Sequence, residues 1–275
     1  MLSQLSLAII NICWFNSIFL NYTRRFEMSS TSEASIQIYG DLRIRAFRVA
    51  WMCEELRLPW TLEETFPWTE KMYDVNPLGK VPVIKDEGFY LYESAAILNY
   101  LADKYQETAG LQLIPKVGTK ERAIYDQFLM VIFTDLESCG LWTHRKFVDL
   151  ALHSRNLELM RELHYIHIAE TAKPAKYTFD RALKILTTQL EGNNYLLGDN
   201  FSVIDIHFLI DLEWAEALNW VKGNPQEKLL KDYYDRVRQR TAYKTCWKMR
   251  SLLDLSSKSL NTFTPANQEP PIGME

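Results

Sequence analysis

The sequence predicts two unlike parts, an N-terminal α/β part followed by a part made only of helices. Residues 36–105 switch between apolar residues at strand spacing and apolar residues at helix spacing, with turn residues at the switches. Beyond residue 119 almost every apolar pattern has the spacing of a helix. The length of 275 residues also leaves room for about two domains.

The N-terminal part contains six predicted elements in the order strand, helix, strand, then, after a loop, strand, strand and helix. They are residues 36–39, 45–56, 60–66, 81–85, 89–92 and 94–105. The first three have the lengths of a right-handed crossover between parallel strands, and the turn at 86–88 makes the next two strands an antiparallel hairpin. This βαβ-ββα order is that of a thioredoxin-like domain.

The C-terminal part is predicted to be an all-α helical bundle. Ser202 and Asp205 form a capping box that begins a buried helix. Other helices are predicted from apolar stripes at 125–136, 157–172, 179–190 and about 226–249. The predicted boundaries are a leader over 1–34, an α/β domain over 35–110, a linker over 111–118, a helical domain over 119–250 and a loose tail over 251–275.

Composition argues against several classes of partner and site. The formal net charge is −4 and no face carries a stripe of Lys and Arg, so no nucleic-acid partner is predicted. The cysteines are scattered without a Cys-x-x-Cys pair, so the sequence predicts neither a zinc site nor a disulfide framework. Nothing in the sequence requires a metal or a nucleotide. This cysteine usage is typical of a reducing compartment, for which we expect the cytoplasm.

The first 27 residues leave several fates open. Residues 6–20 are an apolar run, shorter than the roughly 20 residues of a membrane-spanning helix. Arg24 and Arg25 follow the run, so an anchor here would keep the rest of the chain on the cytoplasmic side. A membrane anchor, an organelle transit peptide and an upstream extension ahead of a start at Met28 all fit this segment.

Five stretches together resemble the soluble glutathione S-transferases. They are Tyr39-Gly40, RAFRVAWMCEEL at 45–56, NPLGKVP at 76–82, Glu93-Ser94 and YLLGDNFSVID at 195–205. The stretches follow one another in the order of that family. The resemblance implies a thioredoxin-like glutathione-binding domain packed on an all-helical domain, in a chain that forms a homodimer.

The resemblance also implies which residues bind glutathione. Pro82 is implied to be a cis-proline that exposes the backbone of Val81, and this backbone pairs with the cysteinyl part of glutathione as a short added strand. Ser94, at a predicted helix start, is implied to bind the γ-glutamyl carboxylate. Glu93 then complements the γ-glutamyl amino group, and Lys80 meets the glycyl carboxylate.

The residue that activates the thiol does not carry over from the family. Many relatives use the serine of a Tyr-Gly-x-x-x-Ser motif to lower the thiol pKa from about 8.5. Ile44 occupies that position here. Other branches use a tyrosine at the end of the first strand, so Tyr39 is the candidate, with a core aromatic as its alternative role. Arg43 and Arg45 are predicted to assist electrostatically, unless they form a solvated basic turn.

The electrophile pocket is expected against the first helix of the helical domain. Its candidate lining residues are Tyr125, Trp142 and His144, with Phe128 and Phe133 in the same stripe. The predicted function is conjugation of glutathione to small hydrophobic electrophiles. Two alternatives remain. One is a glutathione-binding protein without conjugating activity, which acts through protein partners, as Ile44 suggests. The other is a glutathione-dependent thiol reductase, which would need a reactive cysteine such as Cys53.

Overall fold

The computed structural model describes residues 36–149 and 168–256. Seven elements make up the α/β part: β1 (Ile36–Gly40), α2 (Ala46–Leu56), β2 (Trp60–Glu64), α3 (Glu70–Val75), β3 (Val83–Asp86), β4 (Phe89–Tyr92) and α4 (Ser94–Tyr105). The helical part contains α5 (Lys120–Val131), η1 (Ile132–Trp142), η2 (Arg145–Asp149), η3 (Ala169–Thr171), α8 (Ala172–Leu190), α9 (Val203–Ala217), α10 (Glu227–Arg238) and α11 (Thr241–Ser256). The predicted fold class is confirmed.

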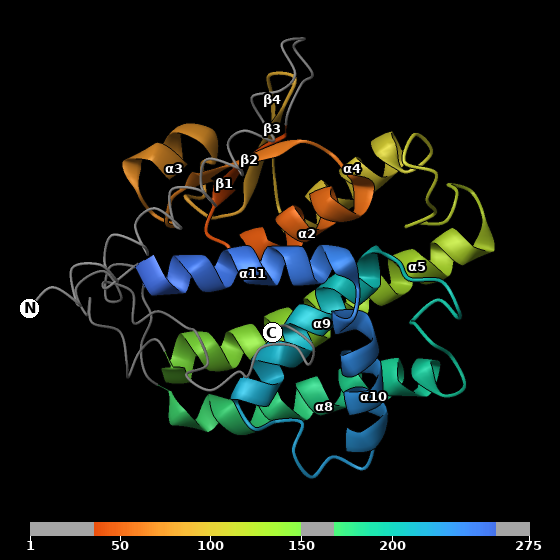
Figure 1. Ribbon diagram of the computed structural model, residues 1–275. Coiled ribbons are helices and arrows are strands. Elements are labelled where there is room, and N and C mark those ends of the chain that lie inside the picture. The colour runs from red at the N-terminus through yellow and green to blue at the C-terminus, as the bar shows by residue number, and fades with distance from the viewer. Residues whose placement is uncertain (1–35, 150–167, 257–275) are drawn as a thin grey trace, which may run out of the picture.

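A mixed four-stranded sheet organises the α/β part (Figure 1). Its strand order is β2-β1-β3-β4, with β1 parallel to β2 and antiparallel to β3, and β3 antiparallel to β4. Alternate residues of β1 face opposite sides of the sheet. Ile36 and Ile38 join the large core formed with α2 and α4. Tyr39 and Val83 instead pack with Met72 of α3 on the other face.

The connection between β2 and β3 differs from the predicted loop, because it contains the short helix α3. Thr69 caps this helix by accepting a hydrogen bond from the Met72 amide at 3.3 Å. A helix of six residues is too short to produce a recognisable apolar period. The strand β3 begins only at Val83, so Val81 and Pro82 lie outside it.

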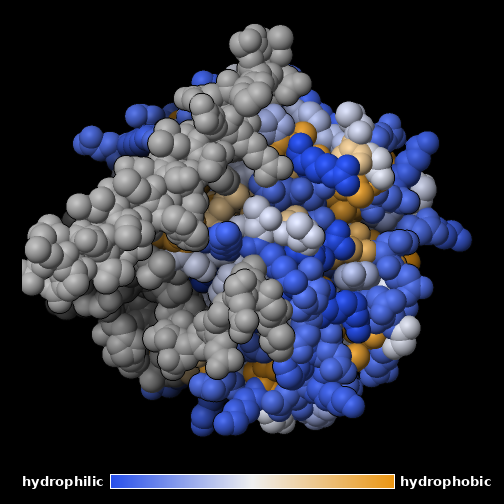
Figure 2. Space-filling view, in the orientation of Figure 1, coloured by the Kyte–Doolittle hydropathy of each residue, from blue (hydrophilic) through white to orange (hydrophobic). Residues whose placement is uncertain are grey.

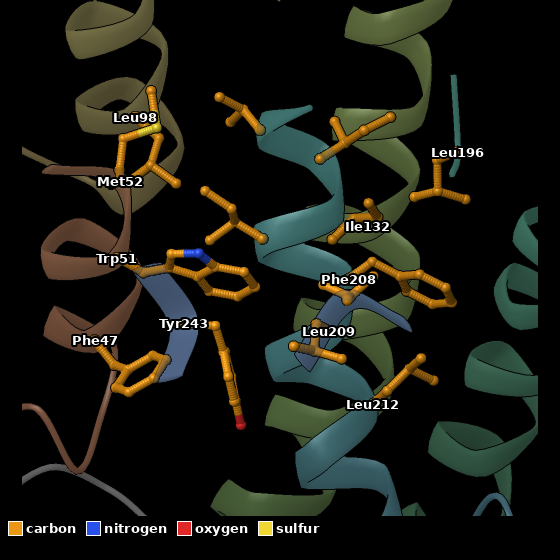
Figure 3. Packing of buried hydrophobic residues seen from close by; sticks show 14 of the residues in the cluster. Phe47, Trp51, Met52, Leu98, Ile132, Leu196, Phe208, Leu209, Leu212 and Tyr243 are labelled. Carbon is orange, nitrogen blue, oxygen red and sulfur yellow. The ribbon is translucent and has the colours of Figure 1, made fainter. Parts of the chain in front are cut away.

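The two parts share one hydrophobic core, which Figure 3 shows around Trp51. The indole of Trp51 lies between α2 and α9, with its ring centroid 5.0 Å from that of Tyr243 on α11. Its N–H donates to Glu55 Oε1 at 2.9 Å, so the buried polar atom is satisfied. The face drawn in Figure 2 is by contrast mostly hydrophilic among its described residues. The packing of Trp51 against Tyr243 fixes α2 against the helical part.

A buried ion network also joins the two parts. Arg48 on α2 is 1% exposed and binds Glu137 of η1, with Nη1 and Oε2 2.7 Å apart, as well as Asp211 of α9. Arg45 forms a second ion pair with Glu137. Burial opposes ionisation of Glu137, but the two arginines outweigh it and hold the pKa of this carboxyl below its usual range. The network therefore fixes the N-terminal turn of α2 against η1.

The capping box at the start of α9 is present as predicted. One Asp205 oxygen accepts from the Ser202 amide at 2.9 Å, and the other accepts from the Leu196 amide and the Tyr233 hydroxyl, each at 3.0 Å. Asp205 is fully buried. A carboxylate with this many donors fixes the turn before α9 as well as the helix start.

The helical part differs from the prediction in two places. The stripe predicted as one regular helix is α-helical to Val131 and then π-helical through η1. The helix α11 extends to Ser256, into the predicted tail. Arg250 of this helix packs over the ring of Trp247 in the same helix and over the ring of Phe47 in α2. The leader, most of the helix predicted at 157–172 and the tail beyond residue 256 lie outside the described residues. No helix in the described ranges has the length and apolarity to cross a membrane.

Replacing Arg48 with Met tests the ion network. The substitution leaves Asp211 buried without its cation, so we expect the free energy of unfolding to fall by about 3–5 kcal/mol. Urea denaturation measures this change. Lys231→Met is the control, because its pair with Asp235 is solvent-exposed and contributes less than about 1 kcal/mol. Equal stability of the two variants would show that the ion network does not contribute this free energy of unfolding.

Candidate functional site

The segment before β3 is held by the side chain of Asn76, which is 2% exposed. Its Nδ2 donates to the Lys80 carbonyl at 2.8 Å, and its Oδ1 accepts from the Leu78 amide at 3.0 Å. The Val81–Pro82 peptide bond is cis, as predicted. Within the described ranges, neither the amide nor the carbonyl of Val81 forms a backbone hydrogen bond. Val81 therefore presents backbone groups without a backbone partner just before β3, at the end of an interior strand of the sheet.

Gly40 brings the start of α2 beside this segment. Its φ of +150° lies in a region that L residues rarely adopt. A side chain here would also collide, since an added Cβ would lie 2.8 Å from Ala46 Cβ and 3.4 Å from Val81 Cβ. Because this position has no side chain, the loop before α2 can pass directly beside Val81.

The junction between β4 and α4 lies beside the same segment. Tyr92 pairs with Val83, so the chain on either side of that pair brings Glu93 and Ser94 toward Pro82 and Val81. Glu93 is exposed and has a φ of +71°, a strained value for a non-glycine residue. Ser94 begins α4 and is 3% exposed, and its hydroxyl has no hydrogen-bond partner among the described residues. The junction thus offers a carboxylate, a hydroxyl and a helix N-terminus.

The loop between β1 and α2 confirms that no side-chain hydroxyl follows Gly40. Ile44 is partly exposed at the position where many relatives have serine. Arg43 is 6% exposed, and its Nε lies 2.9 and 3.0 Å from the two carboxylate oxygens of Asp41. Its charge is therefore largely neutralised within the loop. The Asp41 carboxylate thus offsets much of the positive charge by which Arg43 is predicted to assist, and that role stays a prediction.

Tyr39 faces away from this loop. Its hydroxyl donates to Gln37 Oε1 at 3.1 Å, on the α3 side of the sheet. Burial and a hydrogen bond with Tyr90 raise the pKa of Tyr39 to about 12. Strand alternation gives residues 37 and 39 the same face, so the hydroxyl points back along β1. This arrangement favours the alternative core role of Tyr39, and its catalytic role stays a prediction.

The three predicted pocket residues lie in three different surroundings. The Trp142 ring faces α2, with the guanidinium carbon of Arg45 4.9 Å from its centroid. The His144 ring packs edge-on against Trp220, with 5.0 Å between centroids. Tyr125 is fully buried and its hydroxyl donates to Asn99. Tyr125 therefore packs in the core in this structure, and its place in the electrophile pocket stays a prediction.

The cysteine chemistry that a thiol reductase needs is not available at Cys53. Its side chain is fully buried, and burial raises the pKa of the thiol above its ordinary value. Within residues 36–149 and 168–256, no group of three or more His, Cys, Asp and Glu side chains is arranged to hold a metal ion.

Sequence reasoning missed two positioning residues. Asn76 belongs to the NPLGKVP stretch, but nothing in that stretch assigned it a role of its own. Its role depends on the hydrogen bond to Lys80 across the turn. Glu137 carried no signal, because a lone acidic residue in a helical stripe reads as a surface position. Only the fold brings Arg45 and Arg48 to it.

Comparison with known proteins agrees with this arrangement. The sequence profile described as "Glutathione S-transferase, N-terminal domain" matches residues 45–104, and the one described as "Glutathione S-transferase, C-terminal domain" matches residues 163–241. Together they match just over half of the chain. The two matches fall on the sheet-containing part and the helical part in the expected order.

Individual relatives carry the same family name. The chain is 31% identical over 137 residues to glutathione S-transferase hmp2 of Hypomyces subiculosus, and this match spans 50% of the chain and 60% of that relative. The chain thus spans less than two thirds of that protein. It is 23% identical over 240 residues to glutathione S-transferase F4 of Arabidopsis thaliana, spanning 82% of the chain and 90% of the relative.

Solved structures share the whole fold. A glutathione transferase from Methylococcus capsulatus matches with a TM-score of 0.64 at 24% identity, covering 79% of this chain and 99% of that one. The transferase URE2P8 of Phanerochaete chrysosporium, solved with oxidized glutathione, matches with a TM-score of 0.65 at 19% identity, covering 83% and 100%. The matched profiles, the named relatives and the shared fold lead to one conclusion: this chain belongs to the glutathione S-transferase family.

Proposed function

We propose that this chain binds glutathione as its thiolate and conjugates it to small hydrophobic electrophiles. Residues 35–110 bind glutathione, residues 119–250 carry the electrophile site, and residues 111–118 join them. The observation that carries the proposal is the pair of free backbone groups on Val81, which lie beside both the start of α4 and the loop before α2. An extended peptide such as glutathione pairs with an open strand edge through its own backbone.

The charged ends of glutathione have partners around this end of β3. The Ser94 hydroxyl and the free amides at the N-terminus of α4 suit the γ-glutamyl carboxylate. The exposed Glu93 carboxylate suits the adjacent amino group, and the exposed Lys80 suits the glycyl carboxylate. This assignment gives each formal charge of the peptide one opposite charge or one helix terminus.

Thiol activation is proposed to come from the N-terminus of α2. Within the described ranges, the backbone amides of Arg45 and Ala46 donate no hydrogen bond, and the Arg45 guanidinium lies in the same turn. Lowering a thiol pKa by two units requires about 2.7 kcal/mol of preferential stabilisation of the thiolate. Two amide donors and a partly exposed cation can contribute this amount.

The reaction then needs no further group from the protein. The thiol proton passes to solvent, and the thiolate sulfur attacks the electrophilic carbon. A carbon–sulfur bond forms, and the leaving group departs with the electron pair of the bond that breaks. A second candidate function is glutathione binding without conjugation, which Ile44 favours because the site lacks a hydroxyl beside the thiol.

Chain assembly and location complete the proposal. The functional unit is a homodimer, supported by the open edge strand β4, on which Phe89 is 52% exposed and Tyr90 and Tyr92 are also exposed. The cytoplasm is the proposed location, supported by the unpaired thiols of Cys53, Cys139 and Cys246.

The dimer can be tested at its aromatic edge. We expect sedimentation analysis of the full chain to give twice the chain mass, and Phe89→Asp together with Tyr92→Asp to give a monomer with an unchanged circular dichroism spectrum. Sedimentation of the unaltered chain as a monomer at micromolar concentration would contradict the dimer.

Ser94→Ala separates glutathione binding from helix capping. If the hydroxyl binds the γ-glutamyl carboxylate, calorimetry should show glutathione affinity weakened by about 1–3 kcal/mol, with little change in the free energy of unfolding. Thr119→Ala is the matched control, since Thr119 caps α5 by accepting from the Arg122 amide at 3.1 Å. This variant should lose about 1 kcal/mol of stability and keep its glutathione affinity. The opposite pattern for Ser94 would make it a cap only.

Tyr39→Phe and Arg45→Met separate the two sources of thiol activation. The pH profile of kcat/KM with a chlorodinitrobenzene should rise at the pKa of the thiol. We expect Tyr39→Phe to keep this midpoint, because its hydroxyl binds Gln37. Arg45→Met should move the midpoint upward by up to about one pH unit, because the thiolate loses a nearby cation. A shifted midpoint in Tyr39→Phe would restore the tyrosine mechanism.

A further inference from the structure

The carboxylate of Asp41, which is 1% exposed, holds the loop between β1 and α2. Its Oδ1 accepts from the Arg43 backbone amide at 2.7 Å, which closes an Asx turn. Both carboxylate oxygens also accept from the Arg43 Nε, at 2.9 and 3.0 Å. The Asp41 carbonyl accepts from the Ile44 amide at 3.1 Å. Asp41 therefore binds the backbone of the two residues that directly precede Arg45.

The guanidinium of Arg43 extends this hold to β2 and the residues after it. Its Nη2 lies 3.3 Å from a carboxylate oxygen of Glu64, and its central carbon lies 5.8 Å from the ring centroid of Phe66. The Thr65 amide donates to the Gly40 carbonyl at 3.1 Å. The loop is thus bound both within itself and to the segment that follows β2.

This loop ends beside the proposed glutathione site. Gly40, directly before Asp41, is so close to Ala46 and Val81 that an added Cβ would lie 2.8 and 3.4 Å from their Cβ atoms. The amides of Arg45 and Ala46 donate no backbone hydrogen bond within residues 36–149 and 168–256. A displacement of the loop would therefore move these two amides relative to Val81.

The buried pair of Asp41 and Arg43 is not explained by stability alone. Their side chains are 1% and 3% exposed, and burying two charges costs about as much free energy as their attraction returns. Apolar side chains of similar volume often pack in such places with equal or greater stability. The pair instead gives the loop a single conformation, because Asp41 binds Arg43 through its amide and its side chain together.

We infer that Asp41 is a positioning residue for thiol activation, because its side chain fixes the turn that sets the direction of the Arg45 and Ala46 amides. The inference rests on the proposed function, in which these two amides stabilise the thiolate of glutathione. Asp41 is bound within the loop and acts through the backbone. A looser turn presents the amides in a less favourable direction, so the pKa of the bound thiol should rise.

Two double variants that differ only in the acceptor at position 41 test this role. Both carry Arg43→Met, so neither buries an unpaired guanidinium. Asp41→Asn keeps an oxygen that accepts from the amide of residue 43, and Asp41→Ala removes it. The ultraviolet absorbance of the thiolate against pH gives the thiol pKa of bound glutathione. We expect this pKa to be about half to one pH unit higher in the alanine variant than in the asparagine variant.

Further variants keep the test decisive. Asp41→Ser with Arg43→Met offers a weaker acceptor and should give an intermediate pKa, so it replaces the alanine variant if circular dichroism shows that one to be unfolded. Asn224→Ala is the matched control. It removes the same kind of bond, from Asn224 Oδ1 to the Gln226 amide at 2.9 Å, in the turn before α10. This control should leave the thiol pKa unchanged.

The outcomes separate this inference from the proposed function. Equal thiol pKa values in the asparagine and alanine variants, with the thiol of the unaltered chain well below its free value, would overturn the role of Asp41 and leave the proposed function standing. A thiol that titrates near 8.5 in the unaltered chain would overturn the proposed activation and this inference with it.

Discussion

The buried ion network of Arg48 with Glu137 and Asp211 is the constraint on which the site depends. It ties α2, which follows the first strand, to η1 and α9 of the helical part. Removing one partner would leave an uncompensated buried charge, so α2 has one favourable position against these helices. In that position its first turn lies beside both Val81 and Trp142. The proposed glutathione site and the proposed electrophile site therefore meet at the start of α2.

This placement puts Arg45 beside both proposed sites. Its backbone amide and that of Ala46 donate no backbone hydrogen bond within the described ranges and are proposed to serve the thiol, while its guanidinium lies over the Trp142 ring. Glu137 forms an ion pair with that guanidinium and limits its movement. A family member without a hydroxyl after its first strand can thus still offer positive potential at the thiol. Fixed backbone donors and a fixed cation thus take the place of a side-chain donor in the proposed site.

The features that could be predicted from the sequence are those with a local signal, such as an apolar period or a capping motif. Strand and helix periods fixed the βαβ-ββα order, and the capping box at Ser202 and Asp205 predicted the start of α9. The residues proposed for glutathione lie in two short stretches, so local motifs sufficed to propose them. The features that the sequence did not predict depended on the direction of a side chain or on distant partners. Neither the Asn99 bond of Tyr125 nor the orientation of Tyr39 toward Gln37 has a local signature. The six-residue α3 was too short to show a period.

The central claim is that the N-terminus of α2 stabilises the thiolate of bound glutathione although Ile44 replaces the expected serine. The most direct test is the ultraviolet absorbance of the thiolate as a function of pH, measured on glutathione bound to the unaltered chain. The account predicts a thiol pKa at least about one unit below the free value of about 8.5. Bound glutathione whose thiol titrates at the free value would contradict it, and would identify the chain as a glutathione-binding protein without activation of the thiol.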